Sequence, residues 1–245
     1  MGADQNLDWT KAAASALDWW HDAGVDVVVG DEGFAWLDSA AQQLAARQAV
    51  RPMAAEVARA GDALPGDAAA FAAWRVGEAA PEARWGGGAI AASGPADAEL
   101  MVFVDCPERD DRELLMEGEV GRLFERMLAA IGRTRADTAL ASVCVRRPTT
   151  GRVPRDIEAR LGEIARHHVA LAAPKRLLVM GDAASRAILT MNVADARGRF
   201  HTLNHKNGRV TQVVASHHPR FLLDRPTAKA EAWKDLLLLT GEVES

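Results

Sequence analysis

Residues 174–189, PKRLLVMGDAASRAIL, carry the pattern that decides the fold. The apolar run from Arg176 to Met180 is short and continuous, and it predicts a buried β-strand. The strand ends at Gly181, and Asp182 then supplies an N-cap for a helix that begins at once. A buried strand that passes directly into a helix is the unit from which parallel sheets are built.

The same alternation of strand and helix extends in both directions from this stretch. Three further apolar runs predict strands, at 100–104 (LMVFV), 139–145 (ALASVCV) and 210–215 (VTQVVA). Amphipathic stretches predict helices over 118–132, 155–173 and 227–239, the second of them opening just after Pro154. The predicted fold is α/β, a three-layer αβα sandwich with a central four-stranded parallel sheet.

The first 98 residues have a different character. Residues 1–77 are rich in alanine and other helix formers and predict a helical N-terminal extension. Residues 78–98 contain three consecutive glycines, Gly86 to Gly88, and predict a linker. The expected organisation is therefore 1–77, 78–98 and an α/β domain over 99–245. Four tryptophans of the extension are interpreted as packing anchors: Trp9, Trp19, Trp20 and Trp36.

Composition restricts the class of protein. The chain has 245 residues, of which 49% are hydrophobic and 26% charged, the balance of a soluble globular protein. No apolar run approaches the ~18 residues of a membrane span, and the first residues lack the features of a secretory signal. The only cysteines are Cys106 and Cys144, which excludes a disulfide framework and any iron–sulfur cluster held by cysteines alone. A cytoplasmic protein without a membrane partner is expected.

Charge is unevenly distributed along the chain. Residues 1–111 carry a balance of −12, whereas residues 112–234 carry +10, mostly from arginine. Such asymmetry is typical of proteins with a polyanion-binding part, and arginine grips phosphate through two parallel hydrogen bonds. An arginine-rich composition spread over solvated helix faces would give the same count, and charge alone leaves both interpretations open.

Polar side chains follow each predicted strand, where ligands bind in open α/β sheets. A carboxylate, two arginines, a helix start and two histidines should converge at this edge, which favours anionic-substrate and proton chemistry. These residues are Asp105, Arg146, Arg147, Gly181, His217 and His218. A zinc site formed from His201, His205, His217 and His218 is conceivable, although no recognised ligand spacing supports it.

The ordered motifs from residue 100 to 238 resemble the family 4 branch of the uracil-DNA glycosylase superfamily. VDCPERDD stands at the family's first motif, and SVCVRRPTTGRVP is similar to a strand followed by a CRPP…R-x-P segment. PKRLLVMGDAASRAIL resembles a third conserved stretch, and HHPRFLL resembles the second signature, His-Pro-x-x-Leu-Leu. The resemblance implies an enzyme that flips a deoxyuridine out of DNA and hydrolyses its N-glycosidic bond.

The resemblance assigns roles to individual positions. His218 would donate to a carbonyl of the leaving base, Asp105 would orient or activate water, and Ser142 would take the place of a base-reading asparagine. Met116 stands where the family has a stacking phenylalanine, and Cys106 and Pro107 complete the base-binding set. The expected DNA contacts are Arg147, Arg152, Gly181 and Arg220, with Phe221 and Leu222 as wedges into the duplex.

Departures from the family pattern leave alternatives open. Glu108 replaces a glycine that lets the backbone approach the ligand, and Asp224 replaces an arginine. Arg146 and Arg160 stand at two cluster-ligand positions, so the family's four-cysteine [4Fe–4S] cluster should be absent and no cofactor is expected. The chain is either a cluster-free glycosylase or a non-catalytic relative that binds single- or double-stranded DNA or a partner. An unrelated α/β hydrolase or transferase is a third option. The N-terminal helices could also dimerise the chain.

Overall fold

The computed structural model describes residues 9–22 and 63–241, which belong to two separate compact units, 1–62 and 63–245. The described part of the first unit is the helix α1 (Trp9–Asp22), which has no buried residue. Trp9, Trp19 and Trp20 are exposed on this helix, so they do not pack against a core within its described residues. Trp36 lies outside the described residues. None of the helices that the structure describes is long and apolar enough to cross a membrane.

The second unit is built on a five-stranded mixed sheet with the order β2-β1-β3-β5-β4. Four strands run parallel, as predicted: β1 (Leu100–Val104), β2 (Thr138–Ser142), β3 (Arg176–Met180) and β5 (Val210–Ser216). The prediction of four strands was wrong, because β4 (Phe200–Asn204) pairs antiparallel with the edge of β5. Its residues alternate between exposed and partly buried, so β4 has no continuous apolar run to reveal it.

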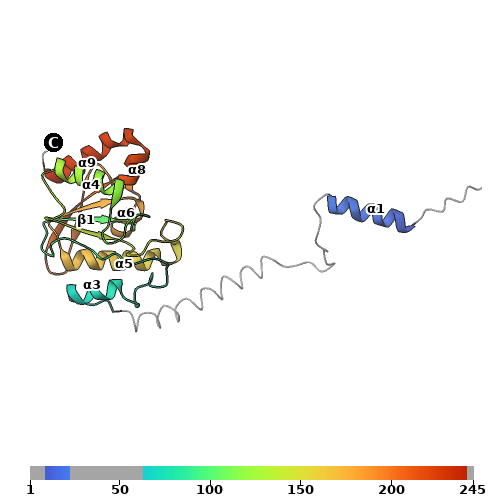
Figure 1. Ribbon diagram of the computed structural model, residues 1–245, viewed down its shortest axis with the longest axis horizontal. Helices are drawn as coiled ribbons and strands as arrows, with labels where there is room; N and C mark the ends of the chain where they lie inside the picture. Colours follow the sequence, from blue (N-terminus) through green and yellow to red (C-terminus); the bar gives the residue numbers. More distant parts are fainter. Residues whose placement is uncertain (1–8, 23–62, 242–245) are drawn as a thin grey trace, which may run out of the picture. The chain divides into compact units, whose positions relative to one another are not determined.

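Helices pack on both faces of this sheet (Figure 1). Successive strand residues point to opposite faces, so Met101 and Phe103 belong to one core cluster and Val102 and Val104 to the other. The first cluster includes α3 (Ala68–Val76), α5 (Arg155–Ala172) and α6 (Asp182–Leu189). The second includes α4 (Gly118–Ala130), α8 (Pro219–Asp224) and α9 (Lys229–Thr240). The short elements α7 (Val193–Ala196) and η1 (Pro226–Ala228) complete the described unit.

Residues 63–98 belong to the same compact unit as the sheet, so this unit begins well before the predicted boundary at residue 99. Two buried side chains of this segment form an ion pair with each other, in which Arg75 Nη1 lies 2.5 Å from Glu82 Oε1. Arg75 also donates to the carbonyl oxygen of Val143, and the Val145 N–H donates to Glu82. The segment predicted as a linker is irregular in structure but is packed against the end of β2.

The segment also covers the outer edge of β2. Ser93 and Leu140 exchange two backbone hydrogen bonds of 2.9 and 2.8 Å in an antiparallel bridge. Further along, the Ile90 N–H donates to the carbonyl oxygen of Val145 over 2.8 Å. Strand β2 ends at Ser142, three residues earlier than predicted, and the chain beyond it is buried between this segment and β1.

Candidate nucleobase site

His218 is the second residue after β5, at the carboxyl-terminal edge of the sheet. It is 5% exposed, and its Nδ1 accepts a hydrogen bond of 3.2 Å from the Arg220 N–H. Burial, followed by the charges of Arg220 and Arg147, lowers the pKa of His218 to about 3. The ring is therefore neutral at physiological pH and carries its proton on Nε2, which is buried and has no hydrogen-bond partner.

A carboxylate covers this imidazole. Glu108, three residues beyond Asp105 in the loop after β1, is 9% exposed and lies with Oε1 3.7 Å from His218 Nε2. Both of its oxygens accept from Arg220 Nη1 at 2.8 Å, and Arg147 Nη1 lies 3.7 Å from Oε2. The side chain that replaces the family's glycine thus fills the space in front of the histidine.

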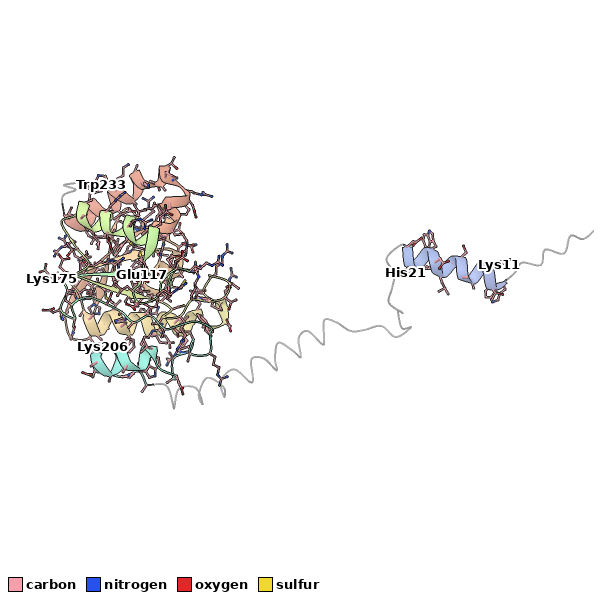
Figure 2. The ribbon with its side chains drawn as sticks, in the orientation of Figure 1. Lys11, His21, Glu117, Lys175, Lys206 and Trp233 are labelled. Atoms are coloured by element: carbon pink, nitrogen blue, oxygen red, sulfur yellow. The ribbon has the colours of Figure 1, made fainter. Side chains whose placement is uncertain are left out.

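The loop that carries Glu108 is held by another carboxylate. Asp111 Oδ2 accepts from the backbone N–H groups of Glu108 and Met116, at 2.7 and 2.9 Å. Its Oδ1 accepts from the N–H of Glu117 at 2.7 Å, and Glu117 lies at the start of α4 (Figure 2). Three backbone donors on one buried side chain fix the loop as a unit.

Asp105 is anchored to the first turn of α6. Its Oδ1 accepts from the Ala184 N–H at 2.7 Å. Gly181 has a φ of +104°, and a Cβ on it would lie 2.7 Å from the Asp105 carboxylate oxygens. Gly181, predicted as a DNA contact, therefore makes room for the carboxylate. Burial raises the pKa of Asp105 to about 6, although the Ala184 N–H opposes that change.

The raised pKa of Asp105 predicts how stability depends on pH. The carboxyl loses its proton near its ordinary pKa of 3.8 when unfolded but near about 6 when folded. The folded state therefore binds more protons between these values, and stability falls as pH rises through this window. Asp105→Asn keeps an oxygen acceptor for Ala184 but removes the titration. We compare the free energy of unfolding of Asp105→Asn with that of the wild type at each pH. We expect this difference to favour the variant more at about pH 7 than at about pH 4, by on the order of 2 kcal/mol.

Urea unfolding of both proteins at the two pH values measures this difference. Asp110→Asn, an exposed change in the loop after β1, is the matched control. A stability difference between Asp105→Asn and the wild type that is the same at both pH values would contradict the assignment.

Four other predicted site residues are buried inside the protein. Ser142 is buried, and its hydroxyl donates to the carbonyl oxygen of Cys144 at 2.7 Å. Met116 is 1% exposed and packs in the core cluster with Phe124, so it offers no surface to a base. Leu222 is also 1% exposed, which leaves nothing to wedge into a duplex. Cys106 is buried, and burial raises the pKa of its thiol to about 12.

The remaining predicted residues lie nearer the surface. Phe221 is partly buried and stacks on His217 with ring centroids 4.8 Å apart. Arg152 is exposed, and Arg220 and Arg147 are 37% and 31% exposed despite their contacts with Glu108. Arg147 also donates to the carbonyl oxygen of Pro107 at 2.7 Å.

A cleft of about 620 Å³ opens beside Glu108. Pro107, Glu108 and Arg147 come to it from the strand tips, and the glycines 86–88 form part of its wall. The remaining lining residues are Ile90, Arg109, Asp111, Arg112, Pro148, Thr149, Thr150 and Gly151. His218, Asp105 and Ser142 are not among them, so Glu108 separates the cleft from the imidazole.

The residues do not fit the iron–sulfur cluster that the family 4 resemblance implies. Such a cluster needs four thiolates, and the chain has two cysteines. Cys106 and Cys144 are both buried, and burial raises the pKa of each, which disfavours the thiolate. Within residues 9–22 and 63–241, no three histidine, cysteine or carboxylate side chains are grouped to hold a metal ion.

Sequence reasoning missed the roles of Glu108, Asp111 and the Arg75–Glu82 pair. The sequence marks Glu108 only as the replacement of a glycine, and its neighbours in sequence do not indicate which way its side chain turns. Asp111 stands well before the N-cap of α4, which is Glu117, so no capping pattern marks it in the sequence. Arg75 and Glu82 are separated by an irregular loop, and no sequence period links them.

Comparison with known proteins agrees with this architecture. Residues 91–237 match the Uracil DNA glycosylase superfamily. The chain is similar to the Type-4 uracil-DNA glycosylase of Pyrobaculum aerophilum, with 22% identity over 167 residues, covering 62% of this chain and 82% of that protein. The family match spans more than half of the chain and includes every strand and tip described above. The chain therefore belongs to the uracil DNA glycosylase superfamily and is family 4-like.

Proposed function

We propose that this protein hydrolyses the N-glycosidic bond of a base flipped out of DNA, with uracil as the first candidate. The observation that carries the proposal is the neutral imidazole of His218, whose Nε2–H is buried and unpartnered at the tip of β5. A buried donor without a partner costs free energy, and such groups are found where a ligand supplies the missing acceptor. The helices on both faces of the sheet support the three-layer sandwich expected of this family.

The chemistry needs a donor where negative charge develops and a carboxylate near the sugar. His218 would donate through Nε2 to a base carbonyl as the bond breaks, which stabilises the departing anion without a change in the charge of the ring. Asp105, with a pKa of about 6, is mostly ionised at neutral pH and would orient water or balance the positive charge of the sugar. Arg147, Arg152 and Arg220 would contact phosphates, which position the strand.

A second candidate is a non-catalytic relative that binds DNA. Three observations favour it. Glu108 covers His218, the Ser142 hydroxyl is used internally, and Met116 lies in the core. A protein of this kind would bind DNA through its arginines and leave the base attached.

Base release separates the two candidates. With protein in excess over a uracil-containing single-stranded oligonucleotide, we expect free uracil and an alkali-labile site, because His218 can stabilise the leaving anion. The same oligonucleotide with thymine in place of uracil is the control. Mass spectrometry of the released base and alkaline cleavage of the strand measure the products. Salt-dependent DNA binding without release of uracil, hypoxanthine or xanthine would favour the second candidate instead.

A further inference from the structure

Three side chains direct donors at one buried carboxylate. Arg220 Nη1 lies 2.8 Å from both oxygens of Glu108, Arg147 Nη1 lies 3.7 Å from one of them and His218 Nε2 3.7 Å from the other. The Glu108 side chain is 9% exposed and forms part of the cleft wall. This is the donor arrangement of a site for a small oxyanion, with the protein's own carboxylate in place.

One of these donors lacks a proper partner. His218 is 5% exposed, and its Nε2 has no hydrogen bond even though the Glu108 oxygen is 3.7 Å away. That separation exceeds a normal N–H···O distance of about 2.9 Å, so Glu108 covers the imidazole without satisfying it. Glu108 therefore leaves this donor available to another acceptor.

We propose that Arg147, Arg220 and His218 form an oxyanion site that Glu108 occupies at rest, and that a DNA backbone phosphate displaces Glu108 from the two arginines. Displacement moves the carboxylate away from His218 and leaves Nε2 free to meet a base. The inference rests on the proposed function in taking DNA as the ligand. It assigns Glu108 the role of a positioning residue that acts through the arginines and His218.

The exchange is physically reasonable because one anion replaces another. Removing a partner from a buried ion pair is costly when a charge is left alone, but a phosphate keeps both guanidinium groups paired. The planar guanidinium fork matches phosphate as well as carboxylate. Arg147 and Arg220 are 31% and 37% exposed, so a phosphate can reach them from solvent.

The backbone around Glu108 limits what has to move. Asp111 holds the Glu108 N–H at 2.7 Å and ties it to Met116 and Glu117. The loop can therefore stay in place while the Glu108 side chain rotates toward the cleft that it lines. Side-chain rotation is fast and does not require unfolding of the loop.

The test compares Glu108→Gln with Glu113→Gln. Each variant removes one negative charge from the same loop, but Glu113 is exposed. General electrostatic effects on DNA affinity are thus matched. The probe is a short fluorescent single-stranded oligonucleotide with a tetrahydrofuran abasic site, which has no base to release. We expect Glu108→Gln to bind it about tenfold more tightly than Glu113→Gln, because phosphate no longer competes with a carboxylate for the arginines.

Arg220→Ala tests where any gain arises. The double variant Glu108→Gln/Arg220→Ala should bind the oligonucleotide no more tightly than Arg220→Ala alone. In a competition experiment at equal ionic strength, inorganic phosphate should displace the oligonucleotide from Glu108→Gln more strongly than chloride does. Equal affinities of Glu108→Gln and Glu113→Gln would overturn the proposal, as would a gain that survives Arg220→Ala. Displacement of Glu108 by free phosphate alone, with no gain for the oligonucleotide, would also overturn it.

A second variant, Glu108→Asp, keeps the proposal testable if Glu108→Gln does not fold. Glu108→Asp keeps the charge but is one methylene shorter, so it cannot hold Arg220 in the same way, and it should also bind the oligonucleotide more tightly than the wild type. Affinity equal to that of the wild type would contradict the proposal. Because binding to an abasic probe needs no base release, absence of glycosylase activity would not affect this result. Normal base release with no gain in binding would reject only the inference about Glu108.

Discussion

Arg75→Ala is expected to lower the free energy of unfolding by about 3–5 kcal/mol. The substitution leaves Glu82, which is 0% exposed, as a buried carboxylate without its cation. It also removes the donor to the Val143 carbonyl at the end of β2. An uncompensated buried charge is among the most destabilising changes a single substitution can produce.

Urea or thermal unfolding of the full chain measures this loss. The matched control is Lys175→Ala, which breaks an ion pair with Glu99 of the same 2.5 Å length between side chains that are 74% and 52% exposed. Because exposed pairs contribute little, we expect the control to change stability far less than Arg75→Ala does. A double variant, Arg75→Met with Glu82→Leu, should recover much of the loss because no buried charge remains. Equal effects of Arg75→Ala and Lys175→Ala would show that Arg75 and its buried contacts with Glu82 and Val143 do not stabilise the fold.

His218→Ala should slow base release by about 30- to 1,000-fold, which corresponds to about 2–4 kcal/mol in the activation barrier. The reason is the loss of the only neutral imidazole donor that the described strand tips place beside Glu108. Single-turnover rates with protein in excess report this change without interference from product release.

His217→Ala is the matched control for this variant. His217 is the preceding residue, but its Nε2 bonds to Glu231 at 3.2 Å and its ring stacks on Phe221. We expect its rate to stay within a few-fold of the wild type, with thermal melting used to confirm that both variants are folded. Equal rates for His218→Ala and the wild type would remove His218 from the proposed reaction.

Continuous apolar runs were sufficient to predict the parallel part of the sheet. The run at 100–104 is buried throughout and the run at 176–180 is buried after Arg176, because helices cover both faces and this environment selects apolar residues. Strand β4 escaped detection because it lies at an edge and alternates in exposure. Helix α8 has no sequence signal of its own, because its six residues are too few to show a helical period.

The sequence indicates at which edge of the sheet the candidate site lies, but not how its side chains are arranged. Strand order determines which residues follow the tips, so Asp105, Gly181 and His218 were correctly placed at one edge of the sheet. The direction of each side chain depends on packing and hydrogen-bond partners, some of them far away in the chain. Ser142 turns to Cys144, Met116 turns into the core with a positive φ of 55°, and Glu108 turns to Arg220, which lies 112 positions away. The pattern of apolar and polar residues in the sequence does not indicate these partners.

The bridge between Ser93 and Leu140 has a consequence for the behaviour of the protein in solution. An uncovered outer strand presents a row of free N–H and C=O groups, to which a strand from another molecule can add. Residues 90–93 occupy that row on β2, so they act as a shield against edge-to-edge aggregation as well as a structural support. A shortened chain that began at residue 99 would lose the shield, whereas one that began at residue 63 would keep it.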